Sequence, residues 1–549
     1  MLPNEEMNRK LIEKANALIN REKGTVHKDP GGRVNIALCY PNRYAVAMSS
    51  LGYQGIYGFF NSQGDVVCER VLFPDQEDLD EYEKTDAELF SLESKRPLSA
   101  FDIIAFSVSF ENDYPNLVRM LKMARIPARR SERGQRYPLV IMGGVCAFFN
   151  PEPLADFMDI IFVGEAEEML EEFLSVCRQT GQREELLLRA AVIEGIYLPE
   201  FYAVAYNEDG TIAERTSLHG APARIKKRTM KDISKSFLRS SVICPDAEFS
   251  DMYLLEVMRG CPWSCRFCVA GHIYRPVRKK EFSRLSAEIN EAVRKTQKVG
   301  LIGPSLSDYP HAEEVLQIQG VDFSITSLRA SAKSGRLVQL MKGHKSISIA
   351  PEAGTQRLRD VINKKISSDD ILDTARLILE SDVETLRLYF MIGLPTETMG
   401  DIEGMIELVK IIRRNTRKGF IRLSVSTFVP KPFTPFQWHP MEPLKGIKEK
   451  LRRIKKGLIR EKGVRVLHDV PKYAHLQGLF ALGNRRVGNI IERMAAGDTD
   501  IMKQGSEDVD IDSIVFRKKD FSEILPWDFI DAGVSKEHLW DEYRKALAG

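Results

Sequence analysis

Three cysteines, Cys261, Cys265 and Cys268, lie within one short run of the chain and constrain it more than any other feature. They follow an apolar segment, 253–257, whose composition predicts a buried strand. Three thiolates at C-x3-C-x2-C spacing can ligate three irons of a [4Fe–4S] cluster and leave the fourth iron without a protein ligand. An open metal position can bind a small molecule, as catalytic metal sites do. The spacing therefore predicts a reactive iron–sulfur centre at the end of a strand.

A zinc site is the alternative use of these thiols. Together with His272 they could form a Cys3His site, although structural zinc sites usually pair two separated knuckles and the sequence has no second close Cys pair. A disulfide is disfavoured, because the N-terminus carries early acids and lacks the apolar stretch of a signal peptide. We expect reduced core thiols of a cytoplasmic protein at the other, scattered cysteines: Cys39, Cys68, Cys146, Cys177 and Cys244.

The length and composition indicate a globular chain of several domains. Its 549 residues suit two to four domains, and its hydrophobic and charged fractions of 43% and 28% are ordinary. The net charge of +2 gives no overall field that would attract nucleic acid or a membrane. No run approaches 18 uninterrupted apolar residues, so no membrane span is expected.

The first part of the chain alternates apolar strand segments with helical patterns. After a helix and linker at 1–30, the alternation over 31–180 predicts a doubly wound parallel, Rossmann-like α/β domain. The predicted strands are 34–40, 66–71, 103–108, 139–142 and 160–163. A hairpin over 195–216 and a basic stretch, 224–235, then form a connecting segment at 181–245.

A second alternation over 246–440 predicts a partial (β/α)6 barrel. Its predicted strands are 253–257, 299–302, 323–328, 346–350, 386–392 and 421–428. Active sites of such barrels lie at the carboxyl ends of the strands, which is where the cysteine run falls. Residues 441–549 begin with a basic helix, 444–462, and are expected to form a small C-terminal domain.

The cysteine run, with Phe267 just before its last cysteine, resembles the signature of the radical S-adenosylmethionine (SAM) superfamily. In that family the open iron chelates SAM, and an electron from the cluster cleaves SAM to methionine and a 5′-deoxyadenosyl radical. Two later segments resemble the same family: Gly393-Leu-Pro-Thr-Glu-Thr, in which Thr396 replaces a glycine, and Phe428-Val-Pro-Lys-Pro-Phe-Thr-Pro-Phe. The resemblance covers roughly 250–440 and implies a protein reductant such as flavodoxin or ferredoxin.

The same resemblance implies SAM contacts at the strand ends. Gly303 and Ser305 occupy the place of the Gly-rich turn that contacts the SAM amino group, although the common Gly-Gly-Glu is absent. Glu352 resembles an acidic residue of the methylthiotransferase-like branch, and a carboxylate can accept two hydrogen bonds from a ribose diol. Arg387 could pair with the SAM carboxylate.

The first α/β domain resembles the cobalamin-binding domain that often precedes a radical SAM barrel. The resemblance rests on segments at predicted strand ends that begin at Pro41, Phe101, Ile141 and Phe162. The residues that it assigns to cobalamin are Ser49, Gly52, Ser107, Ser109, Glu111, Gly143, Gly144 and Glu165. No histidine lies between His27 and His219, so cobalt would receive no axial imidazole from this domain. The alternative is a domain that keeps the fold without the cofactor.

These resemblances favour a radical SAM enzyme that transfers a methyl group from cobalamin to an unactivated carbon of an unknown substrate. The alternative is a methylthiotransferase-like enzyme that modifies RNA, but such enzymes hold a second cluster on three N-terminal cysteines. The scattered Cys39, Cys68 and Cys146 do not resemble that set. A non-catalytic sensor would leave the SAM-site motifs unexplained.

Overall fold

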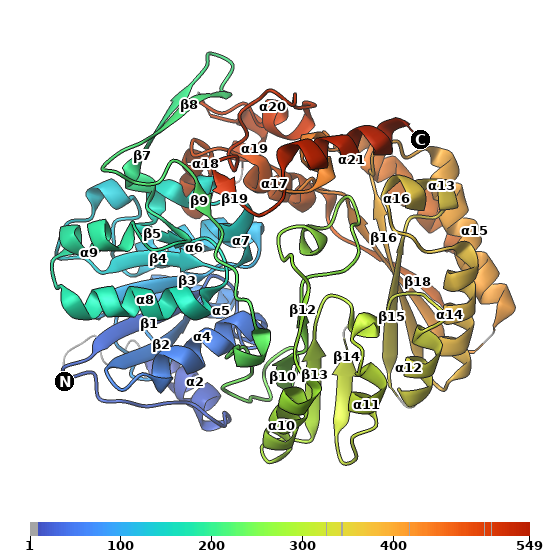
Figure 1. The fold of residues 1–549 in the computed structure, drawn as a ribbon, viewed down its shortest axis with the longest axis horizontal. Coiled ribbons are helices and arrows are strands. Elements are labelled where there is room, and N and C mark those ends of the chain that lie inside the picture. Colours follow the sequence, from blue (N-terminus) through green and yellow to red (C-terminus); the bar gives the residue numbers. More distant parts are fainter. Residues whose placement is uncertain are drawn as a thin grey trace. The chain divides into compact units, whose positions relative to one another are not determined.

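The computed structural model describes residues 9–325, 327–341, 344–416, 418–498, 500–506 and 508–548, which divide into two compact units (Figure 1). Unit 1 comprises Met1–Leu255, Gly483–Asp510 and Glu523–Ala532. Unit 2 comprises Glu256–Leu482, Ile511–Ser522 and Gly533–Gly549. Within the described residues, no helix is both long and apolar enough to cross a bilayer.

Unit 1 is built on a six-stranded sheet of order β2-β1-β3-β4-β5-β6. Its strands are β1 (Val34–Tyr40), β2 (Val66–Leu72), β3 (Ile103–Ser107), β4 (Leu139–Gly143), β5 (Ile160–Phe162) and β6 (Ile196–Tyr197). The first five are parallel and almost wholly buried, as expected for strands covered on both faces. The strand order reverses between β1 and β3, and ligands of such sheets bind at that switch point, outside the carboxyl ends.

Helices connect the strands of unit 1 (Figure 1). They are α2 (Arg9–Asn20), α3 (Tyr44–Ala47), α4 (Leu51–Ser62), α5 (Gln76–Thr85), α6 (Tyr114–Met123), α7 (Val145–Phe149), α8 (Ala166–Gln179) and α9 (Arg183–Ala190). The expected hairpin forms from β7 (Tyr202–Tyr206) and β8 (Ile212–Ser217) only. Its expected first segment is instead β6, which pairs antiparallel with β5, because its two buried residues complete the edge of the main sheet.

Unit 2 contains the strands expected for a partial barrel and one more. A three-stranded sheet has the order β10-β13-β14, and a four-stranded sheet has the order β15-β16-β17-β18. The division between the two units falls within β10 (Tyr253–Glu256). The other strands are β13 (Lys298–Ile302), β14 (Asp322–Ile325), β15 (Ser346–Glu352), β16 (Thr385–Ile392), β17 (Phe420–Thr427) and β18 (Val464–His468). β18 pairs parallel with β17, so the sheet continues beyond residue 440, where the predicted barrel ended.

Helices cover one face of the β15–β18 sheet. The apolar residues of β16 and β17 alternate between buried and less buried positions, and the buried set faces α14 (Ser368–Glu380), α15 (Met399–Asn415) and α16 (Leu444–Leu458). The remaining helices of unit 2 are α10 (Phe282–Val293), α11 (Ala312–Leu316), α12 (Ser334–Leu340), α13 (Gln356–Val361), α17 (Pro471–Leu482), α20 (Ile511–Phe516) and α21 (Lys536–Ala548).

The last hundred residues are divided between the two units. α18 (Val487–Ala495), α19 (Ile501–Gln504) and β19 (Ile530–Asp531) belong to unit 1, and β19 pairs with β9 (Ile225–Lys226) of the same unit. One interaction that holds this C-terminal segment in unit 1 is an ion cluster around the fully buried carboxylate of Glu152.

Glu152 accepts a hydrogen bond from Tyr197 at 2.5 Å and pairs with Arg215 at 3.0 Å and Arg485 at 3.4 Å. Burial by itself would raise the pKa of Glu152, but the charges of Arg215 and Arg485 outweigh it and lower the pKa to about 2. Because Arg485 comes from the C-terminal segment, this cluster holds that segment within unit 1.

We predict that Glu152→Gln destabilises unit 1 at pH 7 by about 3–5 kcal/mol, since it leaves two buried guanidinium groups without their carboxylate. The folded-state pKa of Glu152 is depressed from 4.5 to about 2, so the stability that it contributes is present above pH 4.5 and is lost as the pH falls toward 2. Urea denaturation at pH 7 and pH 3 should therefore show a smaller wild-type-to-variant difference at the lower pH. The control, Glu172→Gln in the exposed pair with Arg228, should cost less than about 1 kcal/mol. Equal losses for the two variants at pH 7 would contradict the assignment.

Candidate functional site

The three cysteines lie on a loop that a short ribbon closes within unit 2. β11 (Met258–Arg259) pairs antiparallel with β12 (Arg278–Lys279), and the cysteines lie between them. Cys265 is buried, while Cys261 and Cys268 are half-buried. The loop starts at Gly260, whose φ is 83° and where a Cβ would overlap the carbonyl of Tyr274, so only glycine fits there.

A second segment, 361–365, holds this loop in place. The backbone N–H of Arg266 donates to the carbonyl of Ile362 at 3.0 Å, and its guanidinium donates to that of Val361 at 2.7 Å. Asn363 donates to the carbonyl of Ser264 at 2.9 Å. These contacts fix the loop between its cysteines, so the thiols are positioned by protein contacts as well as by any bound metal.

Two cations lie beside the thiols. Arg329 lies near Cys265, whose thiolate its charge stabilises, and it donates to the carbonyls of Lys364 and, at 2.8 Å, Lys365. Burial raises the pKa of all three thiols, to about 11 for Cys268, whereas the charges of Lys364 and Arg329 act in the opposite direction at Cys265. Thiolates are the metal-binding form, so metal binding here would release protons, and the two cations would offset the resulting negative charge.

Trp263 links the cysteine loop to the turn after β13. Its indole N–H donates to Asp308 at 2.7 Å, and the guanidinium of Arg329 stacks on its ring at 3.5 Å. Ser305, expected to contact SAM, donates to the same Asp308 carboxylate at 2.7 Å. Gly303 lies beside the side chain of Met258, where a Cβ would come within 2.7 Å. The turn thus packs against the cysteine loop, and the SAM contacts expected at Gly303 and Ser305 stay a prediction.

Glu352 is the last residue of β15 and adopts a φ of 67°, which is rare for a residue other than glycine. Its carboxylate accepts from the ammonium of Lys364 at 2.9 Å. Burial would lower the pKa of Lys364, but the charges of Glu352 and Cys265 raise it overall. A non-glycine residue in the left-handed region is typical of functional sites, and here it directs a carboxylate to the thiol-bearing end of the sheet.

Arg387 lies farther from the carboxyl ends of the strands than the pair of Glu352 and Lys364. Glu352 is in register with Phe390 on the neighbouring strand, three residues beyond Arg387, so their backbones differ by about 10 Å along the strands. The guanidinium Nε of Arg387 is buried without a hydrogen-bond partner among the described residues. Phe267 is half-buried between the cysteines.

His272 takes part in the loop structure and does not join the thiols. Its Nε2 lies 3.2 Å from the carbonyl oxygen of Cys265, and burial lowers the pKa of the imidazole to about 4. Among the residues that the structure describes, no group of three His, Cys, Asp or Glu side chains is gathered around one metal position. Neither a Cys3His arrangement nor the three thiols alone are therefore gathered around a metal position in the described residues.

In unit 1, the strand ends at the switch point are bridged by side chains. Asn42, after β1, donates to Asp113, after β3, at 2.9 Å, and burial raises the pKa of Asp113 to about 7. Beside this bridge, Ser107 ends β3, Ser109 and Phe110 are exposed, and Glu111 is buried.

The other residues assigned to cobalamin fall into two groups. Gly52 and Gly143 have free space, since a Cβ at Gly143 would approach only Phe162, at 3.8 Å, and one at Gly52 nothing within 4 Å. Three others hold protein segments together. Ser49 bonds with Ala45 and Phe249, Glu165 accepts from the N–H of Met230 at 2.8 Å, and Gly144 (φ 104°) packs against the backbone of Val108.

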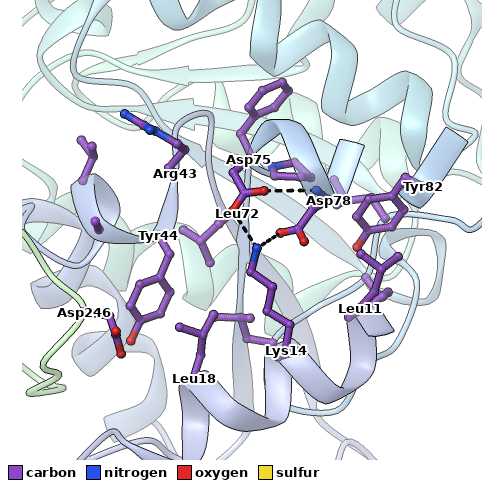
Figure 2. A pocket seen from close by; sticks show the side chains of 18 of the residues that line it. Leu11, Lys14, Leu18, Arg43, Tyr44, Leu72, Asp75, Asp78, Tyr82 and Asp246 are labelled. Carbon is purple, nitrogen blue, oxygen red and sulfur yellow. Dashed lines mark hydrogen bonds and ion pairs between the residues drawn. The ribbon is translucent and has the colours of Figure 1, made fainter. Parts of the chain in front are cut away.

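A separate cavity of about 370 Å³ lies in unit 1 between α2 and the loops after β1 and β2 (Figure 2). Lys14 reaches from α2 to Asp75 and Asp78 at 2.6 and 2.7 Å, and Tyr44 and Asp246 lie on the other side. None of the residues assigned to cobalamin lines this cavity, so it is distinct from the predicted cobalamin site.

Comparison with known proteins identifies the family of this chain. The family model of the radical SAM superfamily matches residues 255–409, and the model described as radical SAM proteins, N-terminal, matches residues 52–199. An uncharacterized protein from Methanocaldococcus jannaschii is 30% identical over 466 residues, covering 83% of this chain and 90% of that protein. The chain belongs to the radical SAM superfamily.

Two further proteins are more distantly similar to this radical SAM enzyme. The structure of the radical S-adenosylmethionine methyltransferase TsrM from Kitasatospora setae, with cobalamin and a [4Fe-4S] cluster bound, covers 85% of this chain and 99% of its own, with a TM-score of 0.52. At 11% identity, this likeness concerns the fold. The threonylcarbamoyladenosine tRNA methylthiotransferase MtaB of Aquifex aeolicus is 21% identical over 248 residues, which span 42% of this chain and 58% of that enzyme.

Sequence reasoning missed the residues that support the cysteine loop. Arg329, Lys364, Asn363 and Asp308 lie far from the cysteines in sequence and belong to no motif used above. Trp263, inside the C-x3-C spacing, was the one available signal, because a large aromatic in a polar loop needs a partner for its N–H.

The turn after β16 contains a strained residue at the position where the resembling family has a glycine. Thr396 stands where a glycine is common, and its φ is 64°. A β-branched residue in the left-handed conformation costs roughly 1–2 kcal/mol of stability. Replacing it by glycine removes this cost, but the greater freedom of glycine in the unfolded chain cancels part of the gain.

We predict that Thr396→Gly raises the unfolding free energy by about 0.5–1 kcal/mol, measured by urea denaturation. The control, Thr216→Gly on the exposed strand β8, should lower it, because glycine weakens a strand. A loss of stability in Thr396→Gly would show that the contacts of Thr396 with Arg357 outweigh the strain.

Proposed function

We propose that this radical SAM enzyme holds a [4Fe–4S] cluster on Cys261, Cys265 and Cys268, and SAM beside it, to abstract a hydrogen atom from an unactivated carbon. The observation that carries the proposal is a single loop that bears all three thiols, is held by the 361–365 segment and places Cys265 beside Arg329 and Lys364. Three cysteines without a fourth protein ligand suit a cluster with one open iron. When bound, the cluster supplies the electron that cleaves SAM.

The protein groups around this site have separate tasks. Arg329 and Lys364 offset the negative charge of thiolates in a partly buried site, where unpaired charge is costly. The carboxylate of Glu352 retains one oxygen beyond its contact with Lys364 and can accept hydrogen bonds from ribose hydroxyls. Gly303 and Ser305 bring the turn after β13 against the loop, where its backbone can meet the SAM amino group.

We further propose that unit 1 binds cobalamin, which when bound would supply the methyl group transferred to the substrate. The carboxyl ends of β3 and β4 fit this role, because Ser109 and Phe110 are exposed and Gly143 has free space. The fold likeness to TsrM, solved with cobalamin, supports it. No histidine lies between His27 and His219, so this segment offers cobalt no imidazole.

A methylthiotransferase-like reaction on RNA is the second candidate, supported by the local similarity to a tRNA methylthiotransferase. The N-terminal thiols argue against it. Cys39, Cys68 and Cys146 are fully buried in β1, β2 and α7, and burial raises the pKa of Cys39 and Cys68 far above its usual value. Thiols buried in this way do not form an open cluster loop.

We predict that anaerobic reconstitution loads iron and sulfide equivalent to one [4Fe–4S] cluster per chain and that the triple Cys→Ala variant at 261, 265 and 268 loads none. After reduction, the wild-type protein should convert SAM to 5′-deoxyadenosine, measured by chromatography. Cys177→Ala, on α8 of unit 1, is the matched control and should behave as wild type. Stoichiometric zinc with little iron would refute the cluster assignment.

We predict that Glu352→Ala weakens SAM binding to the cluster-loaded protein by ~1–3 kcal/mol, because hydrogen bonds to a charged group are lost. Equilibrium dialysis with labelled SAM measures the change. Glu380→Ala, at the exposed end of α14, is the control and should leave the affinity unchanged. Unaltered affinity in Glu352→Ala would restrict Glu352 to its contact with Lys364.

We predict that Gly143→Leu abolishes retention of hydroxocobalamin through gel filtration while the cluster is retained, because the added side chain fills space at the end of β4. Visible absorbance reports both cofactors. Gly143→Ala should keep the corrinoid, since its Cβ meets Phe162 at an ordinary distance of 3.8 Å. If wild type itself retains no corrinoid while holding its cluster, unit 1 keeps the fold without the cofactor.

A further inference from the structure

Three arginines form a row across the β15–β18 sheet of unit 2. Arg387 on β16 is in register with Arg422 on β17, and Arg422 is in register with Arg465 on β18. Ser348 on β15 continues the row on its other side. Residues in register on adjacent strands point to the same face, so the three guanidinium groups share one face of the sheet.

This face is opposite to the one that the helices cover. The neighbours of Arg387 along β16, Leu386 and Leu388, are fully buried, whereas Arg387 is half-buried. The same alternation leaves Arg422 half-buried and Arg465 exposed. α14 contacts β16 and α16 contacts β18 from the other side. The arginine face is therefore accessible within unit 2.

The three guanidinium groups have no counter-ion among the described residues. Within the described part of the chain, no hydrogen bond or ion pair is made by the side chain of Arg387, Arg422 or Arg465, and the Nε of Arg387 is buried without a partner. Adjacent strands lie about 4.8 Å apart, so the backbones that carry the three arginines span about 10 Å. Like charges directly opposite one another destabilise a sheet, which makes an unneutralised row costly.

The side chain of Tyr389 lies next to this row of arginines. Tyr389 is 39% exposed on the same face, two residues beyond Arg387 along β16. It is in register with Ser424 on β17, which is in register with Leu467 on β18. The face thus combines a row of three cations with an aromatic ring nearer to the carboxyl ends of the strands. Arginine favours phosphate through its fork of N–H donors, and an exposed aromatic ring can stack on a nucleobase.

We propose that Arg387, Arg422 and Arg465 bind the phosphate groups of a small phosphorylated substrate of the nucleoside diphosphate class, whose base lies against Tyr389. This inference rests on the proposed function, because it assigns a substrate class to the same barrel. It places the anionic end of the substrate at the middle of the strands and the rest toward the cysteine-bearing strand ends. It also gives Arg387 a phosphate to bind, in place of the SAM carboxylate.

The test is binding of ADP to the full chain by isothermal titration calorimetry, without cluster or SAM. We expect Arg422→Gln and Arg465→Gln each to weaken ADP binding about tenfold, as loss of a charged hydrogen bond does. Arg465→Lys should recover part of the affinity. Arg376→Gln, which removes an exposed charge on α14, is the matched control and should bind as wild type. The arginine variants should unfold at or above the wild-type temperature, because removing a like charge relieves repulsion.

Several outcomes would overturn the proposal. Adenosine that binds as tightly as ADP would show that the phosphates are not recognised. Equal weakening by Arg376→Gln would show a general charge effect, and binding of tRNA without binding of ADP would point to a nucleic-acid substrate. Because the measurement needs no cluster, a protein that loads its cluster and cleaves SAM yet does not bind ADP refutes this inference alone. ADP binding by a protein that assembles no cluster refutes only the proposed function.

Discussion

The contact between the cysteine loop and the segment after α13 is the interaction on which the site depends. A loop with three thiols, two of them half-buried, has little apolar surface of its own to hold its shape. Its order comes from backbone carbonyls that accept from Arg266 and from the bond between Asn363 and Ser264. Arg329 joins the two segments, since it stacks on Trp263 of the loop and donates to the carbonyl of Lys364. The charge that metal binding requires is thus supplied by the same groups that position the loop.

Parallel strands explain why residues distant in sequence meet at this site. The carboxyl ends of neighbouring parallel strands lie at one edge, so the turn after β13 and the end of β15 lie beside the loop that follows β10. The backbone there departs from ordinary geometry at Glu352 and Thr396, both with positive φ. Such strain persists where surrounding contacts over-determine the conformation. The same sheet carries the arginine row at mid-strand, so chemistry and substrate recognition would occupy different levels of one face.

Sequence patterns predicted most of the fold because continuous apolar runs identify buried parallel strands. The five parallel strands of unit 1 and the six of the barrel lie within a few residues of their expected positions. β6 and β18 were not recognised as sheet strands. β6 has only two residues, and β18 lies beyond the last family motif and has no buried residue. Periodicity alone cannot show which sheet such a segment joins. The allocation of the C-terminal segments depended on Glu152 and Arg485, a pair more than three hundred residues apart.

The sequence by itself determined the chemistry: three thiols at a spacing that suits an iron–sulfur cluster, and strands that place them at a sheet edge. Only the tertiary structure decided which groups surround those thiols, because Arg329, Lys364 and Asn363 reach them through chain crossings that leave no local pattern. It also separated the glycines with open space, such as Gly143, from Gly144, which packs on the backbone of Val108. Register between strands aligned Arg387, Arg422 and Arg465, since that alignment is set by pairing across the sheet and by nothing within any one strand.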